Sequence, residues 1–269
     1  MQVMLCYEIW DFLSQRGGKI VNKIFRYFAF ILCISLFSCG TPSKKSYVIA
    51  VDPAFYSIET LGREKNILAF LTDLLSEISQ QSKMQITIKQ VNWDSLFQGL
   101  QEKQYQGVFS GLTPYNFVMD KYSFSPLILP TGPVLVIPSN SNMDTLELLE
   151  NKEVGIISDS KAVEILQKYP NIIIRNYDSI PKMLNEVMIE KIEAAVVAVL
   201  PALGYVNDLY QGTLKIASQP FTQEGLRMIS IKGADPEFQQ KFNKAFDKLT
   251  SEGIIEKLLA KWNLQNAEN

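Results

Sequence analysis

Histidine is absent from all 269 residues of the chain. Without imidazole there is no histidine general acid or base and no Ser-His or Cys-His nucleophile pair. The commonest protein ligand for transition metals is missing as well. For a chain of this length the absence argues against a hydrolase, and we expect neither a metal ion nor a cofactor.

Cysteine is scarce, and none occurs after residue 39. The three cysteines are Cys6, Cys33 and Cys39. A chain cut just before Cys39 would keep a single cysteine, which excludes a disulfide within the mature chain even in an oxidising compartment.

Long runs of one charge are also lacking. The chain has 26 Lys and Arg residues against 28 Asp and Glu residues, and the two signs are interspersed. This pattern gives no basic surface for nucleic acid, so no nucleic-acid partner is expected. The remaining composition, 47% hydrophobic and 20% charged, is that of a globular protein long enough for two lobes.

The longest apolar run lies near the N-terminus, over residues 27–37. It follows three basic residues, Lys19, Lys23 and Arg26. The run is too short to span a bilayer comfortably and has the layout of a secretory signal peptide. We predict a signal peptide over residues 1–38. Residues 1–20 have no such pattern, and we interpret them as a mis-assigned start, with translation beginning near Val21, or as an extended n-region.

A small residue and a cysteine, Ser38 and Cys39, end the apolar run. This ending resembles a bacterial lipobox, in which the cysteine is lipidated and becomes the first mature residue. We therefore expect lipid on Cys39, a polar tether over residues 39–46, and a location in the cell envelope, periplasmic and anchored to a membrane. The alternative is a buried helix that ends in cysteine by chance.

Short apolar strands alternate with amphipathic helices through the rest of the chain, which predicts an α/β fold with parallel sheets. The expected strands cover residues 47–51, 84–91, 107–109, 124–126, 134–137, 153–157, 172–175, 194–199, 214–217 and 227–231. The expected helices cover residues 66–80, 93–100 with a cap at or near Asp94, 142–151, 161–168, 179–190, 201–209, 236–249 and 252–262.

The strongest candidate for a binding loop follows the strand at residues 107–109. Gly111 has no Cβ, so a ligand could approach its backbone closely. Thr113 would add a hydroxyl beside free N–H groups at an expected helix start. Such a turn suits a small polar or anionic molecule. The alternative is an ordinary connection between a strand and a helix.

Several short motifs, in order, resemble one known family. They are Trp93-x-x-Leu96-x-x-x-Leu100, Ser110-Gly111-Leu112-Thr113, Tyr122-Ser123-Phe124-Ser125-Pro126, Val154-Gly155-Ile156 before Ser160, Ala194-Ala195-Val196-Val197 before Pro201, and Gly253-x-x-x-x-Leu258-x-x-Lys261-Trp262. From about Tyr47 to Leu264 the chain resembles the bacterial extracellular solute-binding proteins of family 3, the polar-amino-acid binders of ABC importers.

The resemblance implies a two-lobe periplasmic-binding-protein fold of type II, with two strands that cross between the lobes. Lobe 1 would comprise residues 47–132 and 224–264, and lobe 2 residues 133–223. A ligand held between the lobes would favour the closed form through its contacts with both.

Carried over residue by residue, the resemblance implies ligand contacts from both lobes. The expected contacts are Asp52, Phe55, Trp93, Gly111, Thr113 and Ser160. Packing in the lobe core is the alternative for Phe55 and Trp93. A plain helix cap is the alternative for Ser160 and is compatible with a ligand contact.

Two charged positions of the family are apolar here. Val118 stands where family members carry an arginine for the ligand carboxylate, and Val199 where they carry an aspartate for the ammonium. Either substitutes exist or the ligand is not a free α-amino acid, because an unpaired buried charge costs several kcal/mol. Arg227 and Lys161 are candidate substitute cations and Asp159 a candidate ammonium partner, with solvated surface charges as the alternative.

The resulting hypothesis is a lipid-anchored, monomeric binding component that delivers amino acids or related small polar solutes to the membrane subunits of an ABC importer. A degenerate docking or sensory lipoprotein without ligand is one alternative. A dehydratase-like enzyme on the same fold is another, although it would need a well-placed general acid, for which only Asp52 and Asp159 are candidates.

Overall fold

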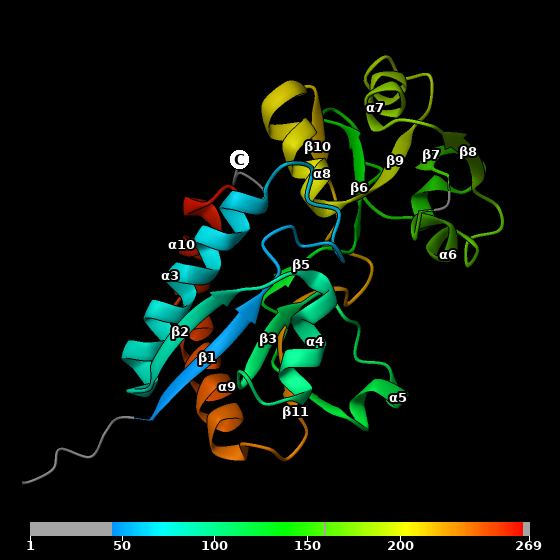
Figure 1. Ribbon diagram of the computed structural model, residues 1–269. Helices are drawn as coiled ribbons and strands as arrows, with labels where there is room; N and C mark the ends of the chain where they lie inside the picture. Colours follow the sequence, from blue (N-terminus) through cyan, green and yellow to red (C-terminus); the bar gives the residue numbers. More distant parts are fainter. Residues whose placement is uncertain (1–44, 159, 266–269) are drawn as a thin grey trace, which may run out of the picture. The chain divides into compact units, whose positions relative to one another are not determined.

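A computed structural model of the chain describes residues 45–158 and 160–265. The predicted signal peptide, Cys39 and Asp159 lie outside those residues. The described chain forms two β-sheets with helices packed against them, as the sequence predicts (Figure 1). Both sheets are mixed, whereas parallel sheets were expected, because β6 (Pro133–Pro138), β10 (Leu214–Ile216) and β11 (Gly225–Ile231) run antiparallel to their neighbours. None of the described helices is both long and apolar enough to cross a membrane.

The first sheet is built mainly from the beginning of the described chain. Its strands are β1 (Ser46–Val51), β2 (Gln85–Gln90), β3 (Gly107–Ser110), β4 (Tyr122–Phe124), β5 (Leu129–Pro130) and β11 (Gly225–Ile231). The order is β2-β1-β3-β11-β4, and β5 also pairs with β11. Strands β1, β2 and β3 are parallel, whereas β11 runs antiparallel to its neighbours.

The second sheet comes from the middle of the chain. Its strands are β6 (Pro133–Pro138), β7 (Glu153–Ile157), β8 (Ile173–Tyr177), β9 (Ala194–Ala198) and β10 (Leu214–Ile216). The order is β10-β6-β9-β7-β8, with β7 parallel to both β8 and β9. Its flanking helical segments are η1 (Glu147–Leu149), α6 (Ala162–Leu166), α7 (Ile180–Met188), α8 (Val199–Gly204) and the π-helical turn η2 (Tyr205–Leu209).

Two layers of helices cover the first sheet, one on each face. The helices are α3 (Glu64–Ser82), α4 (Trp93–Gln101), α5 (Asn116–Met119), α9 (Pro236–Ser251) and α10 (Ile254–Lys261). Helix α3 buries an apolar stripe beside α9 and α10, and α4 packs on the opposite face (Figure 1). Helix α9 begins where the Asp235 carboxylate accepts a hydrogen bond from Phe238 N at 3.1 Å.

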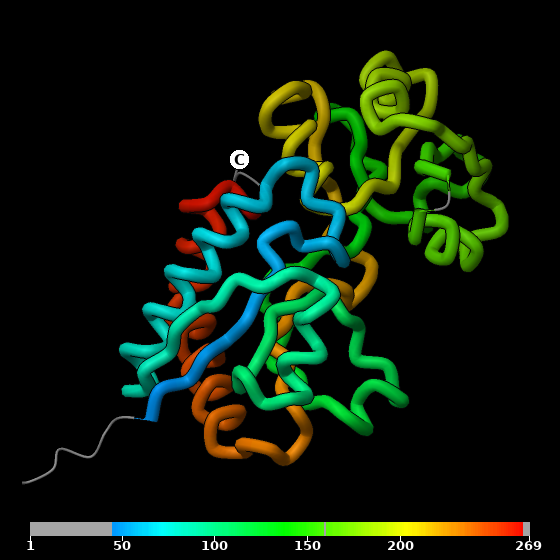
Figure 2. The backbone as a smooth tube through the Cα atoms, in the orientation of Figure 1, coloured from blue at the N-terminus to red at the C-terminus, as the bar shows by residue number. Residues whose placement is uncertain are grey.

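Two backbone segments pass between the sheets, side by side (Figure 2). One runs from β5 to β6 and the other from β10 to β11. They are joined by hydrogen bonds from Thr131 N to Glu224 O at 3.0 Å and from Phe221 N to Pro133 O at 2.8 Å. These crossing segments give the two-lobe arrangement predicted from the sequence. The lobe boundaries predicted at 132–133 and 223–224 stay predictions.

One local prediction is wrong. A helix was expected over residues 142–151, but only the short 3-10 turn at Glu147–Leu149 forms. The Ser141 hydroxyl accepts from Met143 N at 3.2 Å, so a side chain competes with helical bonding at the expected start. The cap of α4 was expected at or near Asp94; the N-cap is Asn92, two residues earlier, and Asp94 lies inside the first turn.

Candidate functional site

The carboxyl ends of the parallel strands place the predicted site residues. Strand β1 ends at Val51 before Asp52, β3 ends at Ser110 before Gly111, and β7 ends at Ile157 before Ser160. In open α/β sheets ligands bind outside this edge, because loop side chains and free backbone groups gather there. The predicted contacts from both sheets therefore lie at the edges where a ligand is expected.

Asp52 organises the loop that follows β1. Its carboxylate accepts hydrogen bonds from Ala54 N at 3.1 Å and Tyr56 N at 3.2 Å, and its carbonyl accepts from Phe55 N at 3.0 Å. Only 6% of Asp52 is exposed. In this conformation its oxygens hold the loop in a tight turn, and its role as a ligand contact stays a prediction.

The same loop folds onto Gly111. The Gly111 N–H donates to Ser57 Oγ at 3.2 Å, and a Cβ built on Gly111 would lie 2.9 Å from Ile58 Cγ1. The close approach that the glycine permits is thus occupied by the chain itself. Thr113 lies half-buried in an irregular segment, three residues before α5.

The two aromatic candidates differ in their surroundings. Phe55 is 3% exposed and belongs to the core between β1, α3 and α9. Trp93 is half-buried at the start of α4, with its ring 5.9 Å from that of Tyr56 and 6.3 Å from that of Phe97. Trp93, Asp52 and Gly111 are therefore brought together by the loop after β1, whereas Phe55 packs beneath it.

Ser160 and Lys161 lie against the second crossing segment. The Lys161 ammonium forms an ion pair with Glu224, which directly precedes β11. The Ser160 hydroxyl is buried and has no hydrogen-bond partner among the described residues, so it does not cap α6 in this conformation. Since Lys161 is neutralised by Glu224, it is a weaker candidate for a ligand cation than the sequence indicated.

Arg227 is the candidate cation whose surroundings are most unusual. It pairs with Ser110 in the register of β11 and β3, which places it at the carboxyl edge of the first sheet. One guanidinium nitrogen, Nη2, donates to Gln223 O at 2.9 Å, while Nε is buried without a partner. Burial lowers the pKa of Arg227, because the charged form loses hydration.

The two valines at expected charged positions are apolar contacts. Val118 is buried on α5, and Val199 begins α8 and packs against both the core of the first sheet and that of the second. Val199 N also donates to Gly132 O in the first crossing segment, at 3.2 Å. Neither position offers a charge to a ligand.

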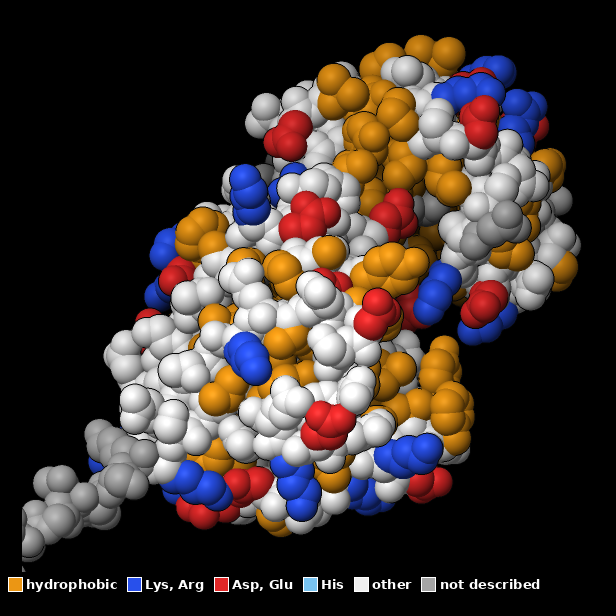
Figure 3. Space-filling model, in the orientation of Figure 1, with side chains coloured by type: hydrophobic (Ala, Val, Ile, Leu, Met, Phe, Trp, Pro, Cys, Tyr) orange, Lys and Arg blue, Asp and Glu red, His pale blue; other side chains and the backbone are white. Residues whose placement is uncertain are grey.

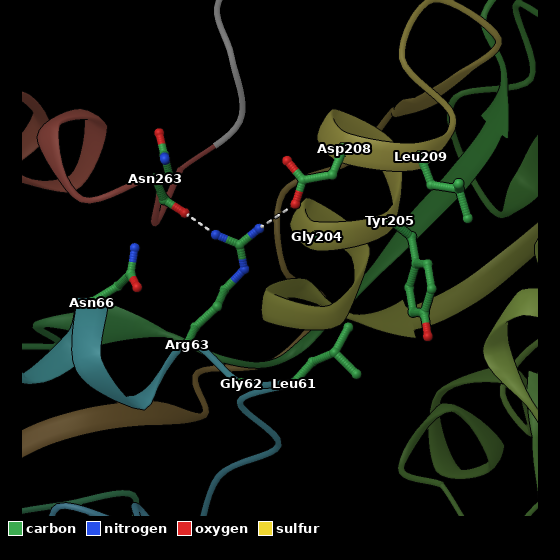
Figure 4. Close-up of a pocket in the computed structure, with 9 residues that line it drawn as sticks. All are labelled: Leu61, Gly62, Arg63, Asn66, Gly204, Tyr205, Asp208, Leu209 and Asn263. Atoms are coloured by element: carbon green, nitrogen blue, oxygen red, sulfur yellow. Dashed lines mark hydrogen bonds and ion pairs between the residues drawn. The ribbon is translucent and has the colours of Figure 1, made fainter.

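A cavity of about 500 Å³ opens elsewhere, between the start of α3 and the helical turns α8 and η2. It is lined by Leu61, Gly62, Arg63, Asn66, Gly204, Tyr205, Asp208, Leu209 and Asn263, none of them a predicted contact. Figure 4 shows the Arg63 guanidinium between Asp208 and the backbone carbonyl of Asn263. It donates a hydrogen bond to Asn263 O at 2.6 Å and lies 3.5 Å from Asp208 Oδ2. This cation is already paired, unlike Arg227.

The visible face of the molecule carries no large patch of one charge. Figure 3 shows acidic and basic side chains interspersed over that face. Among the described residues, no group of three or more His, Cys, Asp or Glu side chains could hold a metal ion.

Sequence reasoning missed several residues that shape this region. Ser57 bonds to Gly111, Glu224 pairs with Lys161, and Thr222 lies two residues before Glu224, yet all three lie in irregular segments. Irregular segments have no periodicity to read, and their contacts depend on how the two crossing segments come together. No signal in the sequence could have singled out Thr222.

The family profile of bacterial extracellular solute-binding proteins, family 3, matches residues 47–265. The chain belongs to this family. Its members are solute-binding proteins, and the type II two-lobe fold predicted from the sequence is confirmed by solved structures.

Characterised relatives cover nearly the whole chain. The arginine-binding extracellular protein ArtP of Bacillus subtilis is 27% identical over 241 residues, which are 87% of this chain and 92% of that protein. The L-cystine-binding protein TcyJ of Escherichia coli is 23% identical over 222 residues, 81% of this chain and 83% of that protein. Amino-acid binding is thus the named activity of these relatives.

Solved structures share the fold at lower identity. The L-cystine solute receptor of Neisseria gonorrhoeae in its unliganded open conformation superposes with a TM-score of 0.67 at 18% identity, covering 83% of this chain and 95% of that one. The substrate-binding domain 2 of Lactococcus lactis GlnP gives 0.63 at 17% identity, covering 84% and 99%.

Proposed function

We propose that this family member is the lipid-anchored binding component of an ABC importer and takes up amino acids or related small polar solutes by hinge closure. The supporting observation is the placement of candidate contacts from both sheets beside the two crossing segments. Ser160 follows β7 of the second sheet, and Arg227 lies in β11 of the first. A ligand that contacts both would favour closure by its differential affinity for the closed form.

Ligand binding should raise thermal stability by mass action. At a ligand concentration of one hundred times Kd, the gain is about 2.7 kcal/mol, which raises the melting temperature of a domain of this size by roughly 5–10 °C. The measurement is differential scanning fluorimetry against the twenty L-amino acids, short peptides and organic acids. Small-angle scattering with and without any ligand that shifts the melting temperature would report closure as a smaller radius of gyration.

The anchor is proposed from Cys39 and the tether over residues 39–46. β1 begins at Ser46, so the first sheet starts where the proposed tether ends. The relative ArtP is named as an extracellular protein, which supports secretion of this chain.

The anchor can be tested in a bacterial host. The full-length chain should incorporate labelled palmitate and enter the detergent phase on Triton X-114 partition, and Cys39→Ser should lose both properties. Cys33→Ser is the matched control and should stay lipidated, because residue 33 lies within the apolar run of the signal. Equal labelling of both variants would contradict lipidation at Cys39.

One observation supports a second candidate, a docking or sensory lipoprotein without ligand. The Gly111 N–H and the space beside it are occupied by Ser57 and Ile58. If this arrangement is permanent, one predicted ligand contact is closed. A melting temperature that no member of the panel changes would favour this candidate over transport.

A further inference from the structure

Three buried side-chain atoms have no hydrogen-bond partner within the described part of the chain, and all three adjoin the second crossing segment. They are Ser160 Oγ, Thr222 Oγ1 and Arg227 Nε. Thr222 and Arg227 belong to the stretch 222–227, and Ser160 precedes Lys161, which is bonded to Glu224 of that stretch. Buried polar atoms are almost always paired, so three unpaired atoms around one short stretch point to a missing partner.

The charge of Arg227 indicates the sign of that partner. The residue is 8% exposed and forms no ion pair with the carboxylates of residues 45–158 and 160–265. The nearest acidic residue along the chain, Glu224, is neutralised by Lys161. A buried guanidinium without an anion is strongly unfavourable, because its hydration is lost and nothing replaces it. An anion at this place would remove that penalty.

Arg63, the partly buried arginine beside the cavity, is a useful contrast. The Arg63 side chain is 12% exposed and lies between Asp208 Oδ2 and Asn263 O. Its cation is thus satisfied by the protein. Arg227 has only the Gln223 carbonyl. The difference is what would be expected if one arginine is structural and the other is reserved for a ligand.

The three unpaired groups can all donate hydrogen bonds. Guanidinium N–H groups and hydroxyls match the oxygens of a carboxylate, and bonds of this kind to an ionised acceptor are about twice as strong as neutral ones. No carboxylate is left unpaired among the buried atoms of the described chain. The guanidinium and the two hydroxyls therefore fit an anion.

Resting on the proposed transport function, we propose that Arg227, Thr222 and Ser160 form an oxyanion site that selects solutes by a carboxylate and does not require an ammonium group. Ser160 follows β7 of the second sheet and Arg227 lies in β11 of the first, so one carboxylate would contact both lobes. A single uncompensated guanidinium favours a monoanion over doubly charged phosphate or sulfate. The ligand class is accordingly small carboxylic acids, with or without an amino group.

The test measures ligand binding and apo stability together. The probes are the L-amino acids, their amides, their des-amino and 2-oxo acids, inorganic phosphate and sulfate. For wild type we expect stabilisation by at least one carboxylic acid and loss of binding when its carboxylate becomes an amide. Arg227→Met should weaken the binding of that acid by about 30-fold or more. Thr222→Val, which keeps the side-chain shape, should weaken the binding of the same acid by roughly 5- to 10-fold.

Apo stability supplies an independent readout. Because Arg227→Met removes an uncompensated buried cation, its ligand-free melting temperature should equal or exceed that of wild type. Arg175→Met removes a guanidinium on β8 that is paired with Glu153 of β7; it is the control and should bind like wild type. A lower apo melting temperature for Arg227→Met would overturn the assignment of an unpaired ligand-binding cation.

The remaining outcomes distinguish failure of the oxyanion site alone from failure of the transport function. If an acid and its amide bind equally, or if Arg227→Met binds as wild type does, the oxyanion site is wrong and the transport function stands. Selective binding of phosphate or sulfate would replace the carboxylate with another anion and overturn the ligand class. If no probe changes the wild-type melting temperature, the transport proposal fails and the oxyanion site fails with it.

Discussion

Gly225→Ala is expected to lower the free energy of unfolding by about 3 kcal/mol or more. Gly225 has φ of +151°, and a Cβ there would lie 2.2 Å from Leu129 O and 3.0 Å from Pro130 Cα. The obstacle is the backbone of strand β5, which pairs with β11 and cannot turn aside as a side chain could. The two strands would have to separate. Chemical denaturation followed by circular dichroism measures the loss.

Gly233→Ala is the matched control for backbone strain alone. Gly233 also has a positive φ, +73°, but no atom lies within 4 Å of its added Cβ. Its cost should be about 1 kcal/mol, the usual penalty for a left-handed residue with a Cβ. A loss of stability at Gly225 no larger than that at Gly233 would show that β5 and β11 can accommodate the added methyl group without separating.

Leu203→Ala is expected to cost about 2–5 kcal/mol, the range for removing a buried leucine from a core. Leu203 lies on α8, which follows β9 of the second sheet, yet it is 1% exposed and belongs to the apolar core of the first. Gly204 beside it lies against Leu61 and Arg63, at the start of α3. This helix therefore joins the two cores, and truncation should weaken their coupling.

Denaturation followed by two probes tests that coupling. The intrinsic fluorescence of Trp93 and Trp262 reports on helices packed against the first sheet, and far-ultraviolet circular dichroism reports on the whole chain. In wild type the two transitions should coincide, and in Leu203→Ala they should shift to lower denaturant. Leu209→Ala is the control, since Leu209 is 64% exposed and its truncation should change stability by less than about 0.5 kcal/mol. Equal effects of the two substitutions would contradict a joint role for α8.

The regular elements could be predicted because their apolar patterns are local. The strand at 153–157 is confirmed residue for residue as β7, and the helix predicted at 66–80 extends by only two residues at each end as α3. In both cases burial of the patterned side chains agrees with the propensity of the segment. Agreement between local pattern and burial is what makes such elements predictable.

The failures occurred where polar side chains or proline act on the backbone. The expected helix start near Thr113 is displaced to Asn116, because Pro114 disfavours helical geometry in the residue before it. Ser141 similarly binds the backbone at the expected start of the helix at 142–151. The sequence shows that Pro114 and Ser141 are present, but it does not show how they act on the backbone.

The candidate site was predictable only in part. Asp52, Gly111 and Ser160 could be placed because strand ends locate them. The loop closing over Gly111 and the unpaired hydroxyl of Thr222 depend on contacts between segments far apart in sequence. Those contacts are a property of the folded chain, so neither periodicity nor composition indicates them.

The hydrogen bond between Gly111 and Ser57 has a consequence for binding affinity. A ligand that accepts a hydrogen bond from the Gly111 N–H must first displace the Ser57 hydroxyl. The Ser57 side chain therefore competes with the ligand for this donor. The apparent dissociation constant would then equal the intrinsic constant divided by the fraction of molecules in which the loop has moved away. A substitution that shortens the Ser57 side chain would lower the apparent dissociation constant, although that residue makes no contact with the solute.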